Sequence, residues 1–225
     1  FGVPRYDSVE ALLEKARPQV VSITTPVINH RDLTLQALEA GCHVLCEKPI
    51  AISLAEAEEM LAAADRADRL LSICLQYRHW EESGYLRERI ANGDFGSVHF
   101  VRTWGGGVYD FAFHRRQLPG RGALSHWTIH NLDLALWLLG NPEPLSASAF
   151  CHQRLAKYPE ALGPLVDGVG DRAVVADMED FAYGMVRLEN NAVITLEANW
   201  LQSPSQRPEG WEILGAKGTA SLWPI

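Results

Sequence analysis

The sequence contains few cysteines and none of the long apolar runs that mark a membrane protein. Four cysteines occur in 225 residues, without paired C-x-x-C spacing. This pattern excludes a disulfide-stapled mini-protein and a zinc ribbon, and it favours reduced core thiols in an intracellular, cytoplasmic protein. No segment approaches the roughly 18 consecutive apolar residues that a bilayer-spanning helix needs. We therefore expect no membrane partner.

Positive charge is also scarce. The chain has 28 acidic and 20 basic side chains, which gives a net charge of -8. A field of this sign repels phosphate backbones unless a local basic stripe overrides it, and no such stripe is visible. Nucleic acid is therefore an unexpected partner. Apolar residues at 47% and charged residues at 21% are close to the globular average, which excludes a disordered chain.

Neither end of the chain has the sequence features of a natural terminus. The first residue is Phe1 rather than Met, no charged-then-apolar leader follows it, and the last residues stop where a strand-like run begins. We interpret the chain as an interior fragment, from which no targeting segment can be read.

The first part of the chain has the alternation of a doubly wound α/β domain. Two capping patterns, from Asp7 to Glu10 and from Ser53 to Glu56, each predict the start of a helix. Short apolar runs without clean alternation predict parallel strands that are buried on both faces. We expect these strands over residues 20–24, 43–46 and 70–75, and helices over 29–40 and 53–68.

The pattern changes near residue 80. Helices are predicted over 81–92 and 123–139, strands over 98–104, 181–188 and 193–200, and a long connection over 151–178. The last strand alternates apolar and polar residues, which is typical of an antiparallel sheet with one wet face. We therefore predict a partial Rossmann-like α/β domain at residues 1–80, followed at 81–225 by an α+β domain with an open, mainly antiparallel sheet.

Two predicted strands end in polar clusters, Thr24-Thr25-Pro26 and Glu47-Lys48-Pro49. Ligands of open parallel sheets bind outside the carboxyl ends of the strands, so a crevice is expected there. The alternative is that Thr-Pro and Lys-Pro only terminate the strands. A lysine held in such a crevice can lose part of its proton affinity and can then transfer protons or polarise a hydroxyl group.

A second cluster lies on the helix predicted over 123–139. Spacings of four, three and four residues place His126, His130, Asp133 and Trp137 on one helical face. These residues could be hydrogen-bonded core or interface groups. A zinc site is the other alternative, but the glutamate of the H-E-x-x-H motif is absent, and we expect no metal.

Together these motifs resemble the Gfo/Idh/MocA oxidoreductases, the relatives of glucose-fructose oxidoreductase and inositol dehydrogenase. The resemblance rests on Thr25-Pro26 with Asn29 and His30, on Ala40-Gly41 running into Glu47-Lys48-Pro49, and on Gly120 to Leu124 running into His130-x-x-Asp133. It covers most of the chain. It implies a Rossmann domain that binds NAD or NADP, and a second domain whose open sheet supplies the substrate pocket and much of the oligomer contact.

The resemblance also implies roles for individual residues. Lys48 and His130 match the catalytic lysine and the acid/base histidine, and an imidazole with an ordinary pKa of about 6.5 suits removal of a hydroxyl proton. Substrate contacts are expected at His126, Asp133 and Arg78. The expected cofactor contacts are Thr24, Thr25, Pro26, Asn29, His30, Glu47, Lys48, Gln76 and Tyr77.

Two departures from the family pattern bear on function. His126 occupies the position where relatives commonly place an aspartate, so substrate or even reaction can differ. The Gly-rich turn that cradles the pyrophosphate, and the residue that selects NAD or NADP, are expected upstream of this chain. Gly105-Gly106-Gly107 does not replace that turn, because it follows the α/β region and opens no evident helix.

These observations predict an NAD(P)-dependent enzyme that moves hydride to or from a carbinol carbon of a sugar, cyclitol or related polyol. The alternatives are a nucleotide-binding sensor without turnover and an NAD-assisted glycosidase. Arg115, Arg116 and Arg121 could meet an acidic substrate or be solvated, and Trp104, Tyr109 and Phe111 could form a sugar platform or core. A homo-oligomer is expected through the C-terminal sheet, from its apolar face and from Trp200 and Trp211 as exposed-type residues.

Overall fold

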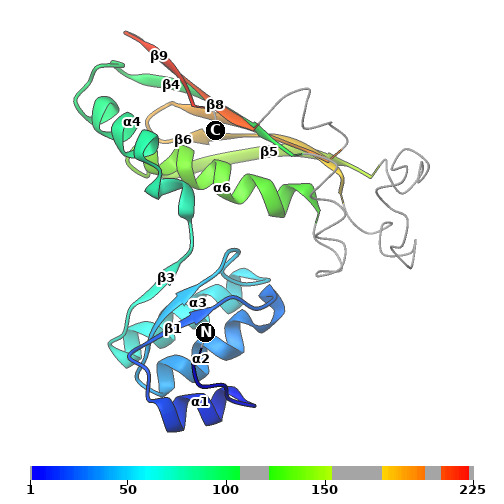
Figure 1. The fold of residues 1–225 in the computed structure, drawn as a ribbon. Coiled ribbons are helices and arrows are strands. Elements are labelled where there is room, and N and C mark those ends of the chain that lie inside the picture. Colours follow the sequence, from blue (N-terminus) through cyan, green and yellow to red (C-terminus); the bar gives the residue numbers. More distant parts are fainter. Residues whose placement is uncertain (1, 107–121, 154–178, 201–208, 223–225) are drawn as a thin grey trace. The chain divides into compact units, whose positions relative to one another are not determined.

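The computed structural model describes residues 2–106, 122–153, 179–200 and 209–222 (Figure 1). The chain divides into two compact units, Phe1–Leu75 and Gln76–Ile225. Several predicted features lie outside the described residues: Gly107, the loop arginines Arg115, Arg116 and Arg121, the aromatic residues Tyr109 and Phe111, Gly120 of the helix entry, and residues 154–178 of the long connection.

The first unit is a three-stranded parallel sheet with helices, as predicted. The strand order is β1-β2-β3, and every pair is parallel. The strands are β1 (Val20–Ile23), β2 (His43–Cys46) and β3 (Leu71–Ile73). The helices are α1 (Val9–Ala16), α2 (His30–Glu39) and α3 (Leu54–Ala67), and a 3-10 turn η1 (Val27–Asn29) precedes α2.

The helix starts follow the capping chemistry of the sequence with one correction. The hydroxyl of Ser53 accepts a hydrogen bond from Glu56 N, as the predicted capping box requires. The cap of α1 is Ser8 rather than Asp7, because the Ser8 hydroxyl accepts from Ala11 N at 3.1 Å. Gly41 lies just past α2 with φ +81°, the left-handed conformation that favours glycine at a helix end.

Burial in the first unit is one-sided, which corrects the prediction that the strands are buried on both faces. Val21, Ile23, Val44 and Cys46 pack with residues of all three helices into one apolar core. The opposite face of the strands is open, and Val20 is 60% exposed and Leu45 39% exposed. Within the described residues, no helix covers that second face.

The second unit is a six-stranded sheet of order β5-β6-β7-β4-β8-β9. The β4–β7 pair is parallel and the other pairs are antiparallel, which confirms the predicted mainly antiparallel sheet. Its strands are β4 (Val98–Gly105), β5 (Pro144–His152), β6 (Phe181–Leu188), β7 (Val193–Asn199), β8 (Gly210–Gly215) and β9 (Thr219–Leu222). Its helical segments are η2 (Gln76–His79), α4 (Glu81–Ala91) and α6 (Ala123–Leu138).

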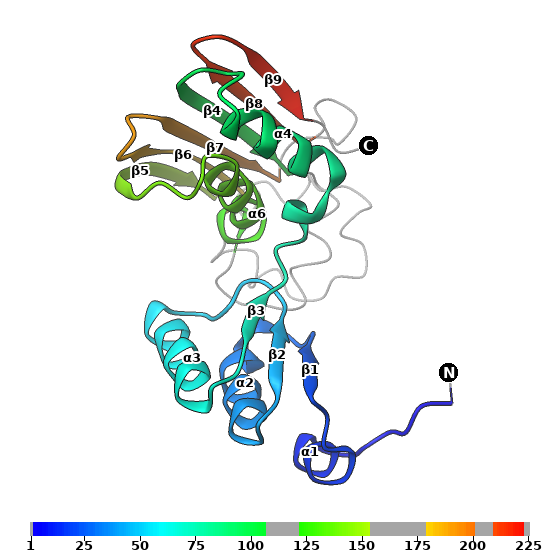
Figure 2. The ribbon, with the colours of Figure 1, turned by 90° about the vertical axis from the view of Figure 1, so that its left-hand side faces the viewer.

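The core of the second unit lies between the sheet and the two helices α4 and α6, which cover the same face (Figures 1 and 2). Leu134 and Leu138 of α6 pack with Ile194 of β7 and Ile213 of β8. Trp200 and Trp211 are both fully buried, so the prediction that they are exposed is wrong. Both indoles are part of the interior of this unit.

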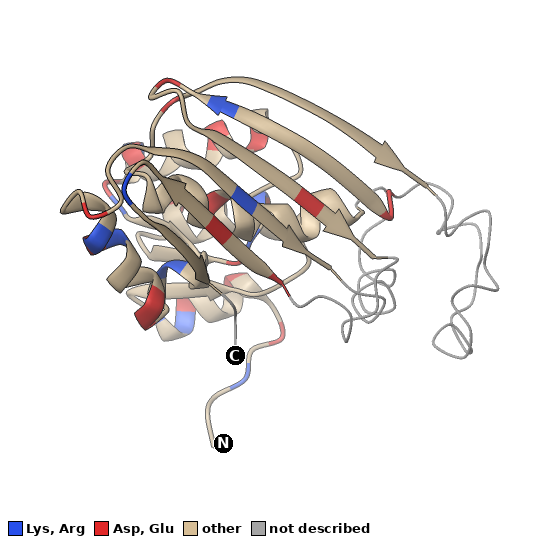
Figure 3. Ribbon diagram, turned by 90° about the horizontal axis from the view of Figure 1, so that it is seen from above, with Lys and Arg blue, Asp and Glu red and all other residues tan. Residues whose placement is uncertain are grey.

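The opposite face of this sheet is open and partly apolar. Burial alternates along β6, so that Ala182 and Val186 face the helices while Tyr183 and Met185 are exposed. The neighbouring edge strand β5 is exposed along its whole length, including Phe150 and Cys151. The prediction that Cys151 is a core thiol is therefore wrong. Seen from above, the strands carry only scattered charged positions (Figure 3).

No helix within the described residues is both long and apolar enough to cross a membrane.

Candidate functional site

The predicted crevice residues of the first unit lie at one edge of the parallel sheet. Ile23 pairs with Cys46 in the β1–β2 register, so the residues that follow, Thr24 and Glu47, leave the sheet at the same edge. Thr24, Thr25 and Pro26 are exposed, while Glu47 and Lys48 are half-buried. The edge thus presents open hydroxyl groups beside a partly buried ammonium group.

A thiol that the sequence analysis did not select belongs to the same edge. Cys74 follows β3 as Glu47 follows β2, and Cys74 N donates to the Cys46 carbonyl at 2.8 Å. Burial and a hydrogen bond to the Glu47 carboxylate raise the pKa of Cys74, while the charge of Lys48 acts in the opposite direction. The same carboxylate also accepts a hydrogen bond from the neighbouring backbone: Lys48 N donates to Glu47 Oε2 at 3.2 Å. The parallel register could have revealed Cys74, because it follows a strand neighbouring the Glu47 strand.

His30, predicted as a cofactor contact, is buried behind this edge. The residue is 1% exposed, and its Nδ1 and Nε2 atoms lie 2.9 Å from the Pro49 carbonyl and 2.8 Å from the Thr25 carbonyl. Carbonyl oxygens only accept hydrogen bonds, so the ring donates to whichever of the two carbonyls faces its N–H. The ring therefore ties the two polar strand ends together, and the preceding Asn29 is the exposed member of the pair.

In the second unit, the stripe predicted on α6 is covered by η2 and α4. The imidazole of His130 stacks on the ring of Tyr77, with centroids 4.5 Å apart. One turn later, Asp133 pairs with Arg78. After another turn, the guanidinium of Arg87 lies 4.1 Å over the Trp137 ring. Three members of the predicted face therefore contact side chains of η2 and α4.

Arg78 and Asp133 were both predicted to contact substrate, and the structure bonds them to each other. Arg78 Nε donates to Asp133 Oδ2 at 2.8 Å, and Arg78 Nη2 donates to the second carboxylate oxygen. These hydrogen bonds, which the Asp133 carboxylate accepts, raise the pKa of Arg78. The Asp133 side chain is 12% exposed and that of Arg78 is 34% exposed, so the guanidinium is the more accessible partner.

The two histidines of α6 differ in accessibility. His130 is 5% exposed, with its Nδ1 atom buried. His126, one turn earlier, is half-buried and lies edge-on to Trp127 at 6.0 Å. Gln76, the last predicted cofactor contact, is exposed at the start of η2. Because the units divide after Leu75, Gln76, Tyr77 and Arg78 belong with His130, while Lys48 belongs to the first unit.

The start of α6 is capped by a carboxylate that sequence analysis missed. Glu179 Oε1 accepts from Leu124 N at 3.0 Å, and the Glu179 carbonyl accepts from Ala123 N at 2.9 Å. A negative charge at this end also suits the helix dipole. The approach requires glycine at position 122, because a Cβ atom there would lie 2.0 Å from the Glu179 carbonyl oxygen. No local sequence signal links residues this far apart.

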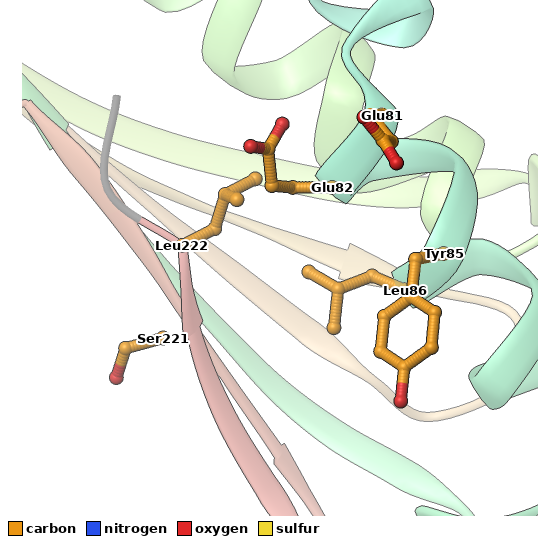
Figure 4. Close-up of a pocket in the computed structure, with 6 residues that line it drawn as sticks. All are labelled: Glu81, Glu82, Tyr85, Leu86, Ser221 and Leu222. Atoms are coloured by element: carbon orange, nitrogen blue, oxygen red, sulfur yellow. The ribbon is translucent and has the colours of Figure 1, made fainter. Parts of the chain in front are cut away.

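Other features of the described residues add no further part to this site. No group of three or more His, Cys, Asp or Glu side chains within them could hold a metal ion. A hollow of about 540 Å³ lies between α4 and β9, and Leu86 and Leu222 point into it (Figure 4). None of the predicted site residues lines it. Its lining residues are Glu81, Glu82, Tyr85, Leu86, Ser221 and Leu222.

Comparison with known proteins assigns both units. Residues 1–74 match the oxidoreductase family with an NAD-binding Rossmann fold, named GFO_IDH_MocA, and residues 84–221 match the GFO/IDH/MocA C-terminal domain. The chain belongs to the GFO/IDH/MocA family. This membership confirms the resemblance carried by the strand-end and helix motifs.

Its relatives in this family include sugar dehydrogenases. The chain is 31% identical to D-glucoside 3-dehydrogenase of Escherichia coli over 97% of its length and 63% of that protein. It is 28% identical to levoglucosan dehydrogenase of Pseudarthrobacter phenanthrenivorans, covering 89% and 54% of the two chains. It thus spans less than two thirds of these GFO/IDH/MocA relatives.

The fold also matches a solved structure, an inositol dehydrogenase homolog from Azotobacter vinelandii complexed with NADH and myo-inositol. The TM-score is 0.78 at 23% identity, over 97% of this chain and 55% of the other. This likeness shows a shared fold.

Proposed function

We propose that the protein is an oxidoreductase that transfers hydride between NAD or NADP and a hydroxyl-bearing carbon of a sugar, cyclitol or related polyol. One observation carries the proposal: the two family models match the two units in order, and each unit contains one of the family-type motifs. Glu47-Lys48-Pro49 ends a strand of the first unit. His130-x-x-Asp133 lies on α6 of the second.

The sheet edge of the first unit fits a nicotinamide cofactor. Thr24, Thr25 and Asn29 expose hydroxyl and amide groups that can exchange hydrogen bonds with ribose hydroxyls, and they lie outside the carboxyl ends of parallel strands. His30 supports this edge from behind by bonding the carbonyls of Thr25 and Pro49. When bound, the cofactor supplies the hydride acceptor or donor. The family name of the matched Rossmann domain favours NAD, and no described residue distinguishes it from NADP.

The proposed chemistry assigns one task to each motif. Lys48 is half-buried, and its ammonium group can hold and polarise the substrate hydroxyl. We assign acceptance of the hydroxyl proton to Nε2 of His130, whose Nδ1 atom is buried. Removing that proton while hydride leaves the same carbon avoids a charged intermediate. Asp133 is tied to Arg78, so we assign it a supporting role on α6 and leave the guanidinium of Arg78 as the substrate contact.

The substrate class rests on the relatives. The 31% identity to a D-glucoside 3-dehydrogenase over nearly the whole chain supports a sugar or glycoside with a free secondary hydroxyl group. The family resemblance implies an aspartate at the position of His126, and we propose that His126 contacts a substrate hydroxyl in its place. The expected product is the corresponding ketone.

We also propose that the open sheet face of the second unit joins copies of the protein. Phe150 and Met185 are each 53% exposed on this face, and Tyr183 is 38% exposed. Exposed apolar surface of this kind is typical of an interface. Tyr183→Lys with Met185→Lys should yield a smaller species in analytical ultracentrifugation. A monomeric wild-type protein at micromolar concentration would contradict this assembly.

The test of the function uses the full-length protein with NAD and NADP and a panel of glycosides, polyols and sugar acids. Net formation of reduced cofactor is expected, and its absence would favour a sensor or a glycosidase that borrows and returns hydride. Lys48→Met and His130→Asn should each lower kcat by about 100-fold or more. Lys15→Met on α1 and the exposed His99→Asn are matched controls and should retain full activity.

A further inference from the structure

We propose that Tyr77, anchored by Glu209, is a positioning residue that fixes the orientation of the His130 imidazole. The importance of that orientation for turnover rests on the proposed function. The contacts themselves all lie within the second unit.

The ring of Tyr77 is held between two other rings. It stacks on His130 with a centroid separation of 4.5 Å and an interplanar angle of 25°, and on Trp80 at 4.1 Å and 27°. Two rings at these distances cannot share one face of a phenol, so the imidazole and the indole lie on opposite faces. Trp211 meets Tyr77 edge-on at 5.5 Å and is fully buried. Tyr77 therefore has little freedom to tilt.

The hydroxyl group of Tyr77 connects this stack to the sheet. It donates to Glu209 Oε2 at 3.1 Å, although 132 residues separate the two in sequence. Glu209 immediately precedes β8, and Trp211 lies two residues further along. The start of one strand thus supplies both the hydrogen-bond acceptor and the indole edge.

This arrangement matters because a histidine side chain does not fix its own ring plane. The terminal torsion of His is broad, so neighbouring groups must set the direction in which the ring nitrogens point. In His130 the Nδ1 atom is buried, and the proposed function assigns proton acceptance to Nε2. A flat ring stacked on the imidazole limits its tilt. Misplacing a proton acceptor by about 1 Å can cost roughly 100-fold in rate.

The experiment separates the ring from the hydroxyl group. Tyr77→Phe keeps the stack and removes the hydrogen bond, while Tyr77→Leu removes both. Glu209→Gln keeps an acceptor oxygen, and Glu209→Met removes it. Tyr85→Phe is the matched control, because Tyr85 is 61% exposed on α4.

The first readout is independent of turnover: the His130 Hε1 resonance of the full-length protein, assigned with His130→Asn. Stacking on an aromatic face shifts this proton upfield. Tyr77→Leu should move it downfield, whereas Tyr77→Phe and Glu209→Gln should leave it nearly unchanged. An unmoved resonance in a folded Tyr77→Leu protein would overturn the proposal, whatever the enzyme does. The shift itself supports positioning even if no sugar is oxidised.

The second readout is the division between kcat and KM. Tyr77→Leu should lower kcat by about tenfold or more with KM little changed, since proton acceptance and not substrate affinity is affected. Glu209→Met and Tyr77→Phe should each give a smaller loss, and their double variant no more than either alone. Equal changes in kcat for Tyr77→Leu and Tyr85→Phe would contradict the inference.

Discussion

Arg78 donates from both Nε and Nη2 to the carboxylate of Asp133, which joins η2 to the middle of α6. Removing one partner leaves a partly buried charge without its counter-ion. Arg78→Met should therefore lower the free energy of unfolding by about 1.5–3 kcal/mol, measured by urea denaturation. Arg78→Lys should recover only part of this loss, because an ammonium group lacks the planar pair of N–H donors that faces both carboxylate oxygens. A double-mutant cycle with Asp133→Asn should show coupling, and additive effects would mean that the pair is not formed in solution.

We expect His30 to contribute to the free energy of unfolding and its exposed neighbour Asn29 to contribute to cofactor binding. His30→Ala removes the buried ring that contacts the carbonyls of Thr25 and Pro49, so we expect a loss of about 1–3 kcal/mol in the free energy of unfolding. Asn29→Ala should change stability by less than about 0.5 kcal/mol, because the side chain is exposed. In the full-length protein, Asn29→Ala should instead weaken NAD binding in calorimetry. The reverse ordering of the two variants would refute these roles.

Two glycines should respond to alanine in opposite directions. Gly122→Ala places a Cβ atom 2.0 Å from the Glu179 carbonyl oxygen, so the start of α6 must shift, at a cost of about 1–3 kcal/mol. Gly84→Ala on the exposed side of α4 meets nothing within 4 Å and should stabilise the protein by about 0.5–1 kcal/mol. Thermal unfolding of both variants checks the pair. A tolerated Gly122→Ala would mean that Glu179 does not cap the helix this closely.

Cys74 should report the charges around Lys48 through its reactivity. Its pKa lies above the usual 9.0, mainly because of burial and then because of the hydrogen bond to Glu47. A raised pKa means less thiolate at a given pH, so alkylation by iodoacetamide should still accelerate above pH 9. Glu47→Gln should speed the reaction at pH 8, and Lys48→Met should slow it. Peptide mass mapping resolves Cys74 from the other three thiols, and identical rates in all proteins would place Cys74 away from both charges.

His126 should affect substrate choice more than stability. The side chain is half-buried on the first turns of α6, and a neutral imidazole can both donate and accept a hydrogen bond. His126→Asp introduces a fixed negative charge, which should favour hydroxyl donors and disfavour sugar acids in relative kcat/KM. His99→Asp on β4 serves as the charge control. If the ranking across the substrate panel is unchanged, His126 is a packing residue.

The strands and helices of the first unit were predictable because each has a local signal. Capping pairs such as Ser53 with Glu56, and the apolar run ending at Cys46, locate elements without long-range information. The open face around Leu45 was not predictable, because burial depends on what covers a strand. Strand β5 was missed because its alternation is built from small residues: Ser and Ala follow one another after Leu145 and give only a weak strand signal.

For the site, sequence spacing identified a face of α6 but not its partners. The stacking of His130 on Tyr77 and the pairing of Asp133 with Arg78 depend on how η2 packs against that helix. Glu179 and Glu209 reach their partners across 55 and 132 residues of sequence. Contacts of this length leave no local pattern in a single sequence.

The parallel pairing of β4 with β7 constrains how the second unit can be synthesised and folded. β4 ends at Gly105, yet its two neighbours in the sheet are β7 (Val193–Asn199) and β8 (Gly210–Gly215). A nascent chain must therefore carry β4 without these partners until β7 and β8 have left the ribosome. Long-range pairing of this kind slows folding and leaves strand edges open to aggregation. Chains truncated before Val193 should depend on chaperones for solubility, since both partners of β4 are then missing.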